Sequence, residues 1–377
     1  MKVGIACWPT YGGSGAVATE LGVALADRGH EVHFITYAPP VRLDSLRRDI
    51  RFHPVSVSAY PLFRYPPYDL ALASKMAEVA EAHSLDLFHV HYAIPHAAAA
   101  LTAREMLGGA RPRILVTLHG TDITVVGIDP AYRRTTQYAL DRSDGVTAVS
   151  QWLVDETVRV FQPRRPVRRI PNFVDLERFR PGCPPSFHGR LAGPGEAVLV
   201  HVSNFRPVKR VLDAVRVFSR VAAARPARLL MVGDGPDRDA AEDEARALGV
   251  ADRVAFLGER AEVERILPAA DLFLLPSESE SFGLAALEAM ACGVPVVATA
   301  TGGLPEVVEH GKSGHLAPVG DVEAMAAFAV SLLADRGRLE SFRAAARARA
   351  EQFERGAVVA VYEELYREVL AGGGGRG

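Results

Sequence analysis

The chain has 377 residues, of which 49% are apolar and 23% are charged, and its formal net charge is −2. This length predicts about two domains, and the balanced charge argues against a nucleic-acid or membrane-surface partner. No apolar stretch is long enough for a membrane span, and the N-terminal apolar run is too short for a signal peptide. The three cysteines are scattered, as expected in a reducing compartment. We therefore expect a cytoplasmic protein without stable membrane association.

The N-terminal half begins with a predicted strand at residues 2–7, a glycine-rich loop and a helix over 16–28 that ends before Gly29. A glycine backbone can approach an anion closely, and the N-terminus of a helix favours negative charge, so this loop is predicted to bind a phosphate. A tight turn without a ligand is the alternative. The glycines of the predicted phosphate site are Gly12, Gly13 and Gly15.

The same loop also matches the dinucleotide-binding fingerprint loosely, through Gly13-x-Gly15-x-x-Ala18. That fingerprint requires an acidic residue at the end of the next strand, where it binds the ribose of NAD. The predicted strand at 32–35 is followed by Thr36-Tyr37-Ala38 instead. An NAD-dependent oxidoreductase is therefore the weaker interpretation.

Further strands are predicted at 51–57, 87–91, 114–118 and 146–149, with helical stretches between them. This alternation predicts an α/β domain with a doubly wound parallel sheet.

Several histidines lie at or near the ends of these strands. His89 and His91 share one face of a strand close to His96, and without a neighbouring carboxylate, packing is favoured over metal binding. His119 ends another strand, just before Gly120-Thr121-Asp122, and is the better candidate for a functional residue.

Residues 129–139 are predicted to form a helix that carries Arg133 and Arg134. Neighbouring arginines can hold a carboxylate or a phosphate through paired hydrogen bonds. Two arginines on a solvated helix face are the alternative.

The second half repeats the alternation after a glycine- and proline-rich stretch at 181–195, which we interpret as a linker. Strands are predicted at 197–202, 228–233, 253–257, 271–275 and 295–300, and helices occupy about 321–370. The stretch from Ser203 to Arg210 follows the first of these strands. Its cations, Arg206 and Lys209, lie where they could neutralise a pyrophosphate, although a basic helix start without a ligand is the alternative.

The strand at 271–275 is followed by a polar loop at 277–281 and a helix, with Glu280 in the loop and Glu288 in the helix. Carboxylates accept hydrogen bonds from vicinal hydroxyls, so a sugar is a natural partner. The N–H groups that begin the helix suit hydroxyl or phosphate oxygens, while a solvated acidic helix start is the alternative. These N–H groups belong to Phe282, Gly283 and Leu284.

Glu280 and Glu288 with Phe-Gly-Leu between them, Gly-Val-Pro-Val-Val-Ala at 293–298 and Gly-Gly-Leu-Pro-Glu at 302–306 resemble the retaining glycosyltransferases of family 4. The resemblance covers essentially the whole chain. It implies the GT-B fold, in which two Rossmann-like, doubly wound domains face each other across a cleft. Residues 1–173 would form the acceptor-binding domain and 174–355 the nucleotide-sugar-binding domain, with a C-terminal helix at 356–371 crossing back onto the first.

The resemblance also implies roles for individual residues. Lys209 would stabilise the leaving diphosphate, Glu280 would bind the transferred sugar, and Glu288 the ribose. Many members have arginine where Asn204 stands, and Arg206 follows two residues later, which leaves the role of that arginine open. The implied catalytic residues are Lys209, Arg206, Glu280 and His119, and the implied donor-binding residues are Gly12, Gly13, Gly15, Asn204, Phe282, Gly283, Leu284 and Glu288.

Within the family, residues 7–22, 119–124 and 203–210 resemble members that transfer N-acetylglucosamine from UDP-GlcNAc to the hydroxyl of L-malate, the first step of bacillithiol biosynthesis. Malate is a dianion, so its site needs cations or hydrogen-bond donors. The candidates are Arg133, Arg134, Ser14, Thr121 and Tyr92.

We expect no required metal or cofactor, with magnesium as an assisting ion at most, and a homodimer is left open. The nearest alternative is a family 4 enzyme with inositol phosphate or a lipid-linked sugar as its acceptor. A non-catalytic nucleotide-sugar-binding protein is a further alternative.

Overall fold

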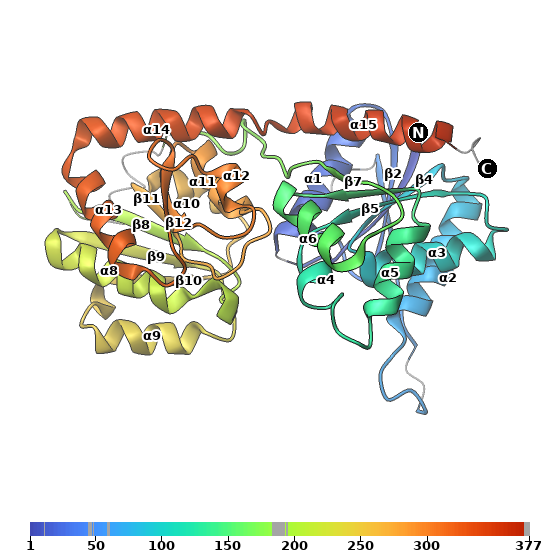
Figure 1. Ribbon diagram of the computed structural model, residues 1–377, viewed down its shortest axis with the longest axis horizontal. Helices are drawn as coiled ribbons and strands as arrows, with labels where there is room; N and C mark the ends of the chain where they lie inside the picture. The colour runs from blue at the N-terminus through green and yellow to red at the C-terminus, as the bar shows by residue number, and fades with distance from the viewer. Residues whose placement is uncertain are drawn as a thin grey trace. The chain divides into compact units, whose positions relative to one another are not determined.

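A computed structural model of the chain describes residues 1–10, 12–43, 47, 49–58, 61–182, 193 and 195–372. The chain divides into two compact units, which we call unit 1 (Met1–Asn172 with Gly356–Gly377) and unit 2 (Phe173–Arg355). Each unit is built on one parallel sheet with helices packed on it (Figure 1). The linker expected at 181–195 lies largely outside the described residues. The acceptor and donor roles expected of the two units stay predictions.

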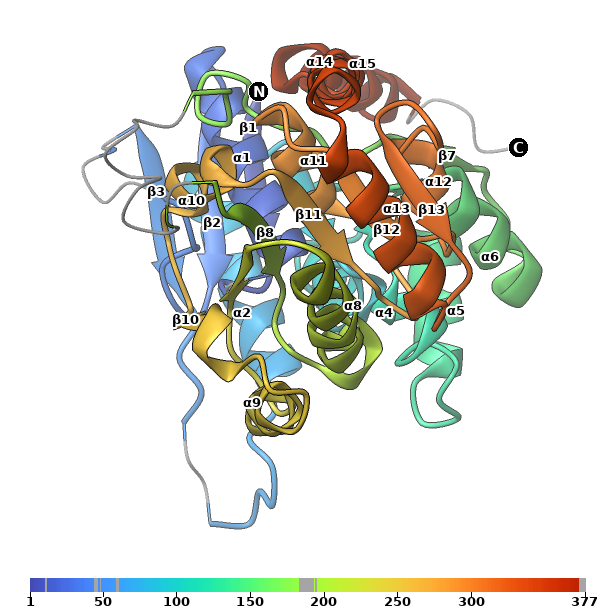
Figure 2. The ribbon, with the colours of Figure 1, turned by 90° about the vertical axis from the view of Figure 1, so that its left-hand side faces the viewer.

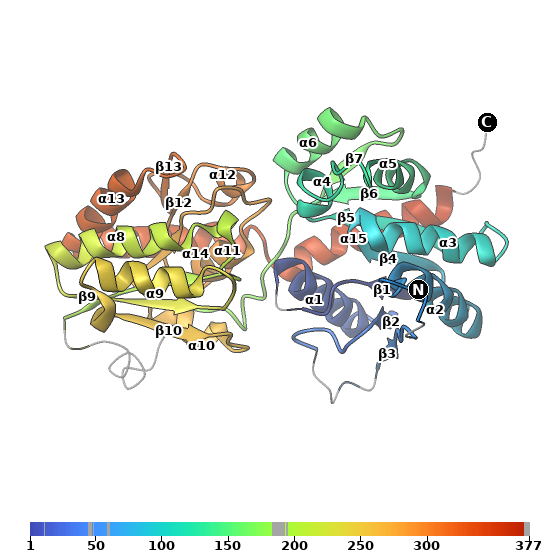
Figure 3. The ribbon, with the colours of Figure 1, turned by 90° about the horizontal axis from the view of Figure 1, so that it is seen from below.

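Within the described residues, the sheet of unit 1 has seven parallel strands in the order β3-β2-β1-β4-β5-β6-β7 (Figure 3). The strands are β1 (Lys2–Ala6), β2 (Glu31–Thr36), β3 (Ile50–Pro54), β4 (Leu87–His91), β5 (Arg113–Leu118), β6 (Gly145–Ala148) and β7 (Val167–Arg169). The helices are α1 (Gly13–Asp27), α2 (Tyr68–His83), η1 (Ala93–Ala97), α3 (Ala98–Met106), α4 (Thr121–Thr124), α5 (Arg133–Arg142), α6 (Gln151–Phe161) and α15 (Arg355–Ala371).

The core of unit 1 forms because its central strands are apolar on both faces, as parallel strands covered by helices must be. Helix α1 packs so closely on the sheet that a Cβ on Gly22 would meet the ring of Phe34 at 2.5 Å. Beside it, α15 buries Tyr362 and Tyr366 against the sheet, and the Arg28 guanidinium of α1 donates to Glu363 of α15 at 2.8 Å. The last helix of the chain is therefore an integral part of unit 1.

The sheet of unit 2 has, among the described residues, six parallel strands in the order β10-β9-β8-β11-β12-β13. The strands are β8 (Ala197–Val202), β9 (Ala227–Val232), β10 (Val254–Gly258), β11 (Leu272–Leu275), β12 (Val296–Thr299) and β13 (Gly314–Ala317). The helices are η2 (Pro207–Lys209), α8 (Val211–Ala224), α9 (Arg238–Ala247), η3 (Ala251–Arg253), α10 (Val263–Ile266), η4 (Leu267–Ala269), α11 (Leu284–Ala291), α12 (Leu304–Val307), α13 (Val322–Ala334) and α14 (Arg336–Glu351).

Helices cover both faces of the sheet of unit 2. Helix α8 lies beside α9 and α13 on one face, while α11 packs against α14 on the other (Figures 1 and 2). The core between α8 and the sheet includes Leu199, Phe218 and Leu274, all fully buried. These apolar layers hold the strands, and hence the loops at their ends, in fixed positions.

The predicted doubly wound architecture is confirmed, but several predicted boundaries were wrong. The short strands β7 and β13 were not predicted, and β3 ends at Pro54 rather than at residue 57. Helix α5 begins at Arg133 instead of 129, because the Asp129 carboxylate accepts from the Ala131 N–H at 2.8 Å and forms a turn before the helix. Asp321 caps α13, since it accepts from the Ala324 N–H at 2.9 Å.

Both sheets reverse their strand order at one point, between β1 and β4 in unit 1 and between β8 and β11 in unit 2. Open α/β sheets bind ligands beside the carboxyl ends of the strands at such a switch point. The segments that directly follow these four strands contain Ser14 in the first turn of α1, Tyr92, Lys209 at the end of η2, and Glu280. The fold thus brings the predicted site residues of each unit to the expected edge of its sheet.

Candidate active site

The centre of the site in unit 2 is an ion pair between Lys209 and Glu280. The Lys209 Nζ lies 2.5 Å from the Glu280 Oε2, and both side chains are largely buried. The residues are 71 positions apart in sequence but follow the neighbouring strands β8 and β11. A paired, partly desolvated lysine of this kind is held in place, which suits it to binding an anionic group.

Backbone hydrogen bonds fix the loops around this ion pair. The Glu278 N–H donates to the Val208 carbonyl at 2.8 Å, which ties the loop after β11 to the loop after β8. The Gly303 N–H donates to the Glu280 carbonyl at 2.8 Å, and a Cβ on Gly302 would meet that carbonyl oxygen at 1.9 Å. Gly302 has a φ of +56°, so both the backbone conformation and the close contact require glycine.

A buried histidine supports the loop that carries Lys209. His201 Nδ1 lies 2.9 Å from the Leu274 carbonyl, and its Nε2 lies 2.7 Å from the Ser203 hydroxyl. Burial lowers the pKa of His201 to about 4, so the ring is neutral at pH 7. Sequence reasoning missed this residue, because a histidine inside an apolar strand gives no sign of what it contacts.

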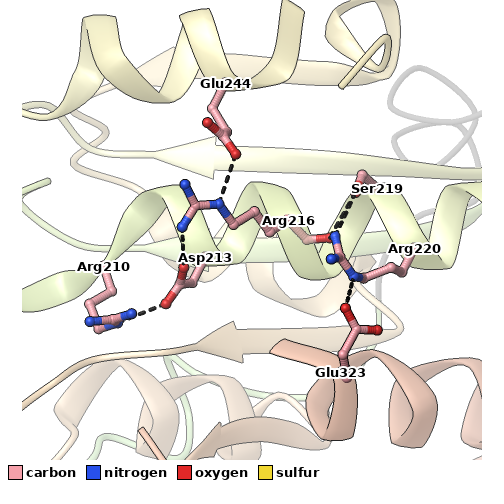
Figure 4. A network of polar contacts seen from close by, with 7 residues as sticks. All are labelled: Arg210, Asp213, Arg216, Ser219, Arg220, Glu244 and Glu323. Carbon is pink, nitrogen blue, oxygen red and sulfur yellow. Dashed lines mark hydrogen bonds and ion pairs between the residues drawn. The ribbon is translucent and has the colours of Figure 1, made fainter. Parts of the chain in front are cut away.

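A charged network anchors the segment immediately after Lys209 (Figure 4). The Arg210 guanidinium donates to the buried Asp213 at 2.7 Å, and Arg216 bridges Asp213 at 3.0 Å and Glu244 at 2.7 Å. Arg210 has a φ of +49°, a conformation that costs free energy for a residue with a Cβ. The network compensates for this cost and fixes the start of α8 relative to Lys209.

The predicted helix after the Glu280 loop is present as α11. Gly283, with a φ of +97°, precedes its first residue, Leu284, and Phe282 is buried with its ring 5.7 Å from that of Phe353. The N–H groups at this end of the helix lie in the loop that Glu280 also occupies. Glu288 lies in the middle of α11 and is buried, which makes it a carboxylate held in one position.

The other two predicted residues of unit 2 differ in their surroundings. Arg206 is exposed, and its carbonyl accepts from the Lys209 N–H at 2.8 Å. Asn204 is partly buried, and within the described residues its Oδ1 has no hydrogen-bond partner. The backbone carbonyl oxygen of Asn204 would lie 2.2 Å from a Cβ on Gly235, so the loops after β8 and β9 are in close contact here.

In unit 1, three predicted acceptor residues come together at one hydroxyl group. The Tyr92 hydroxyl donates to the Ser14 Oγ at 3.1 Å, and the Thr121 hydroxyl lies 3.5 Å from the Tyr92 oxygen. These residues follow β1, β4 and β5. Tyr92 has a φ of +89°, which is rare for a bulky residue and is typical of functional sites.

Asp122 holds two of these loops together. Its Oδ1 accepts from the N–H groups of Gly120 at 2.9 Å and His119 at 3.2 Å, and its Oδ2 accepts from the Ala93 N–H at 3.1 Å. Burial raises the pKa of Asp122 to about 6 despite these hydrogen bonds. Sequence reasoning missed this role, although the motif Gly120-Thr121-Asp122 was noted.

A chain of neutral polar groups leads inward from His119. Its Nε2 lies 2.9 Å from the Nδ1 of His91, whose ring stacks on that of His89 at 4.6 Å. His89 shares hydrogen bonds with Thr117 at 2.7 Å and with the hydroxyl of Tyr366 in α15 at 2.6 Å. Burial lowers the pKa of His89 and of His119 to about 3 and that of His91 well below its ordinary value. At neutral pH these imidazoles therefore act as hydrogen-bonding groups without charge.

The tautomers follow from one further observation. Among the described residues, the buried His91 Nε2 has no hydrogen-bond partner. A proton on that nitrogen would be an unsatisfied buried donor, so the proton belongs on Nδ1 and is donated to His119. The remaining proton of neutral His119 is then on its Nδ1, which makes that nitrogen a hydrogen-bond donor.

The glycine-rich loop precedes and begins α1. Gly12 and Gly13 are exposed at the helix N-terminus, where their backbone is open to an anion. Gly15 is buried, and a Cβ there would meet the carbonyl oxygens of Trp8 and Thr10 at 2.6 and 2.7 Å. Close packing therefore explains why residue 15 is a glycine.

The end of β2 lacks the carboxylate that a dehydrogenase would need to bind the ribose of NAD. At this position the Thr36 hydroxyl donates to the Cys7 carbonyl at 3.0 Å.

The two predicted acceptor arginines lie in the first turn of α5. The Arg133 guanidinium donates to the Val160 carbonyl at 3.0 Å and covers the ring of Phe161 at 5.4 Å, so it serves packing in this structure. Arg134 is exposed. The histidines His89 and His91 do share one face of β4, as predicted, and they pack there.

Comparison with known proteins places the chain in a family. Residues 11–178 match the family described as Glycosyltransferase Family 4, and residues 187–349 match Glycosyl transferases group 1. The chain is also 47% identical over 373 residues to N-acetyl-alpha-D-glucosaminyl L-malate synthase of Bacillus anthracis, covering 98% of this chain and 97% of that protein. The chain belongs to glycosyltransferase family 4.

A more distant relative and a solved structure are also similar to this chain. D-inositol 3-phosphate glycosyltransferase of Mycobacterium marinum is 32% identical, covering 96% of this chain and 83% of that protein. The structure of sucrose-phosphate synthase from Thermosynechococcus elongatus superposes with a TM-score of 0.80 at 24% identity, covering 98% of this chain and 99% of that one. The fold of this family 4 glycosyltransferase is thus GT-B, with two Rossmann-like parallel-sheet units. Within the part of the chain that the structure describes, no helix is long and apolar enough to span a membrane.

Proposed function

We propose that this family 4 glycosyltransferase transfers N-acetylglucosamine from UDP-GlcNAc to the hydroxyl of L-malate with retention of configuration, as the first step of bacillithiol biosynthesis. The observation that supports this proposal is the 47% identity, over nearly the full length of both chains, to the N-acetyl-alpha-D-glucosaminyl L-malate synthase of Bacillus anthracis. The proposal assigns the loops of unit 2 to the sugar nucleotide and most of those of unit 1 to the acceptor, with Gly12, Gly13 and His119 of unit 1 assigned to the donor.

Lys209 is proposed to stabilise the UDP leaving group. As the bond between the sugar C1 and the diphosphate oxygen breaks, negative charge grows on the diphosphate, and a fixed cation favours that change. Arg206 is exposed beside Lys209 and supplies a second positive charge. The N–H groups at Gly283 and Leu284 add fixed dipoles at the start of α11.

The carboxylates of unit 2 are proposed to bind hydroxyl groups. Glu280 already faces Lys209, and its carboxylate can accept from the hydroxyls of the transferred sugar while it holds the lysine. Glu288 is buried in α11 and is proposed to accept from the ribose hydroxyls. The side-chain amide oxygen of Asn204, Oδ1, has no hydrogen-bond partner in the described residues. It can accept a hydrogen bond from the sugar nucleotide.

Unit 1 is proposed to orient the acceptor and the sugar. Ser14, Tyr92 and Thr121 present hydroxyls for the malate carboxylates, and Arg134 on α5 is a further cation. His119, neutral and with a proton on Nδ1, donates to a sugar oxygen. The exposed backbone of Gly12 and Gly13 accommodates the diphosphate.

The proposed reaction balances without a base on the protein. The bond from C1 to the diphosphate oxygen breaks, a bond from C1 to the malate oxygen forms on the same face, and the malate proton moves to the departing phosphate oxygen. Since Lys209 and Arg206 offset the charge, we propose that no metal is required and that magnesium assists at most. Turnover should then persist in EDTA, whereas its loss in EDTA and recovery with Mg²⁺ would contradict this part of the proposal.

The decisive experiment incubates the protein with UDP-GlcNAc and L-malate, follows UDP release and identifies the glycoside by mass spectrometry. Proton NMR of the product then gives the anomeric configuration. We expect an α-glycoside of malate. UDP release without a malate glycoside would contradict the acceptor, and a β-glycoside would contradict retention.

A second acceptor is tested in parallel, because the chain is also 32% identical to D-inositol 3-phosphate glycosyltransferase of Mycobacterium marinum. Inositol 3-phosphate replaces malate in the same assay at equal concentration. We expect malate to be the better acceptor by kcat/KM. A higher kcat/KM for inositol 3-phosphate would replace the proposed function with this one.

A further inference from the structure

Three histidines of unit 1 converge outside the switch-point loops that carry the proposed active site. His33 lies on β2, His53 on β3, and His83 is the last residue of α2. Each offers one ring nitrogen, and these three nitrogens lie within 4.8 Å of one another. The ring centroids are 4.5, 5.2 and 5.3 Å apart.

The fold brings these rings together from three elements. Ile35 of β2 pairs with His53 of the edge strand β3, so His53 points to the same face of the sheet as Ile35 and His33. That face is covered by α2, whose C-terminal end delivers His83 (Figure 3). His33 is fully buried and the other two rings are partly buried.

We propose that His33, His53 and His83 bind one divalent transition-metal ion, with zinc as the best fit. Three imidazole nitrogens without a carboxylate or thiolate form a ligand set that suits Zn²⁺, Ni²⁺ or Co²⁺ and disfavours Mg²⁺ and Ca²⁺. A fourth position remains for water, as in other three-histidine zinc sites.

The orientation of His33 is that of a metal ligand. Its Nε2 lies 3.1 Å from the Glu31 Oε1, so the Nε2 proton is donated to the carboxylate and the Nδ1 lone pair points away from it. That lone pair faces the His53 Nε2 at 2.9 Å. A carboxylate behind a ligating histidine fixes the ring and makes it a better ligand.

The distances require only small movements. Zinc binds imidazole nitrogen at about 2.0–2.1 Å, which places neighbouring nitrogens of a tetrahedral site about 3.4 Å apart. His33 and His53 are now joined at 2.9 Å by a hydrogen bond from the His53 Nε2–H, and when the metal binds there, His53 carries its proton on Nδ1 instead. The remaining nitrogen, within 4.8 Å, approaches by at most about 1.4 Å.

Arg51 is the group that competes with the metal. Its Nη1 lies 2.9 Å from the His83 Nδ1 and 3.2 Å from the Glu31 Oε1, and half of the side chain is exposed. It can therefore keep its contact with Glu31 when the ion binds. On α2, the Lys75 Nζ and the Glu78 Oε2 form an ion pair at 2.6 Å, so together they add no net charge.

The bound ion would join the edge strand β3 and the end of α2 to β2, which is a structural role.

The test uses the full-length protein without a polyhistidine tag, titrated with Co²⁺ and then with Zn²⁺. We expect one Co²⁺ per chain with tetrahedral absorption bands, displacement by Zn²⁺, and a higher unfolding temperature with Zn²⁺. His53→Gln and His83→Asn should each weaken binding at least tenfold. The matched control is His310→Asn in unit 2, whose ring lies 4.7 Å from that of His315 and should not contribute to binding.

The Arg51→Gln variant provides an independent test of the metal site, because it keeps all three imidazoles and removes the competing cation. Binding should then become at least threefold tighter. Unchanged or weaker binding by this variant would contradict the placement of the ion at His83. Absence of saturable binding in the unsubstituted protein, or full binding by the two histidine variants, would overturn the proposal. Removal of the metal should leave transferase turnover at 25 °C unchanged, so this test is separate from that of the proposed function.

Discussion

The switch-point loops of unit 2 carry an ion pair near the surface, whereas in the corresponding loops of unit 1 hydroxyls and a neutral histidine come together and the carboxyl group of Asp122 is buried. In unit 2, Lys209 and Glu280 face each other at 2.5 Å. In unit 1, Ser14, Tyr92 and Thr121 meet through hydroxyls, and His119 is neutral because burial lowers its pKa to about 3. The same strand order thus supports one site that can offset a growing charge and one that can orient a substrate with hydrogen bonds. Each prediction below tests this difference.

The largest expected effect is a loss of stability in acid that is greater in unit 1, which has several buried histidines, than in unit 2, where His201 alone among the described residues is fully buried. Burial lowers the pKa of His89 to about 3, of His96 to about 4, and of His91 well below its ordinary value of 6.5. Below pH 6.5 the unfolded chain binds protons that the folded unit does not, so the free energy of unfolding falls as the pH falls. Between pH 6.5 and 5.5 each histidine contributes about 1 kcal/mol, or about 3 kcal/mol in total, and at lower pH the loss approaches about 1.4 kcal/mol per histidine and pH unit.

The chain contains its own reporter for this prediction. Both tryptophans, Trp8 and Trp152, belong to unit 1, so tryptophan fluorescence in urea follows that unit. Amide hydrogen exchange in β8 and β11 follows unit 2, where His201 is the one fully buried histidine of the described residues. An equal acid dependence of the two signals would contradict the difference between the units.

The next largest effect is expected for Lys209→Ala. If the ammonium group stabilises charge that develops in the transition state, kcat should fall about 10²- to 10³-fold, with a smaller change in the KM for the donor. Steady-state kinetics at saturating acceptor measure both constants. The matched control is Lys312→Ala, a surface lysine of the same unit that lies 3.7 Å from Glu309. A higher donor KM with unchanged kcat would reduce Lys209 to a binding residue.

Glu288→Gln should act on the donor alone. The amide keeps the shape of the buried side chain but accepts from the ribose hydroxyls less strongly, so we expect the KM for UDP-GlcNAc to rise about tenfold with little change in kcat. Glu340→Gln, on the exposed face of α14, is the control. Unaltered affinity for UDP, measured by calorimetry, would reject the ribose assignment.

The smallest effect is expected for Tyr92→Phe in unit 1. The change removes the hydroxyl that joins Ser14 and Thr121, a loss of about 1 kcal/mol, which corresponds to an acceptor KM about fivefold higher. Kinetics with varied malate measure it, with Tyr138→Phe on α5 as the control. If the malate KM does not change, the hydroxyl cluster does not bind the acceptor.

Much of the fold was predictable because its strands are apolar and because residues such as glycine mark where its helices end. The run at 272–275 and the helix end before Gly29 gave the right elements, and 87–91 and 197–202 gave the right bounds. The strands β7 and β13 were missed because they are short edge strands, and β7 contains two exposed arginines among its three residues. Such strands are defined by a neighbouring strand and not by their own pattern.

The candidate site was predictable only as far as sequence position fixes it. The glutamates, Lys209 and the histidine at 119 could be singled out, because each follows a strand that ends at the switch-point edge. Three other features depend on which strands are neighbours. They are the ion pair of Lys209 with Glu280, the hydrogen bonds from two loops to Asp122, and the support that His201 gives to the loop of Lys209. The cluster of His33, His53 and His83 escaped for the same reason.

The central claim is that the loops of unit 2 bind the sugar nucleotide and that most of those of unit 1 bind the acceptor. Hydrogen–deuterium exchange of the full chain with substrates tests this claim most directly. UDP-GlcNAc alone should protect residues 203–210 and 277–288 of unit 2 and the backbone at 12–15. Malate, added to the UDP complex and compared with UDP alone, should protect residues 119–124 of unit 1 and leave 203–210 unchanged. Protection of 203–210 by malate, or none there with UDP-GlcNAc, would contradict the account.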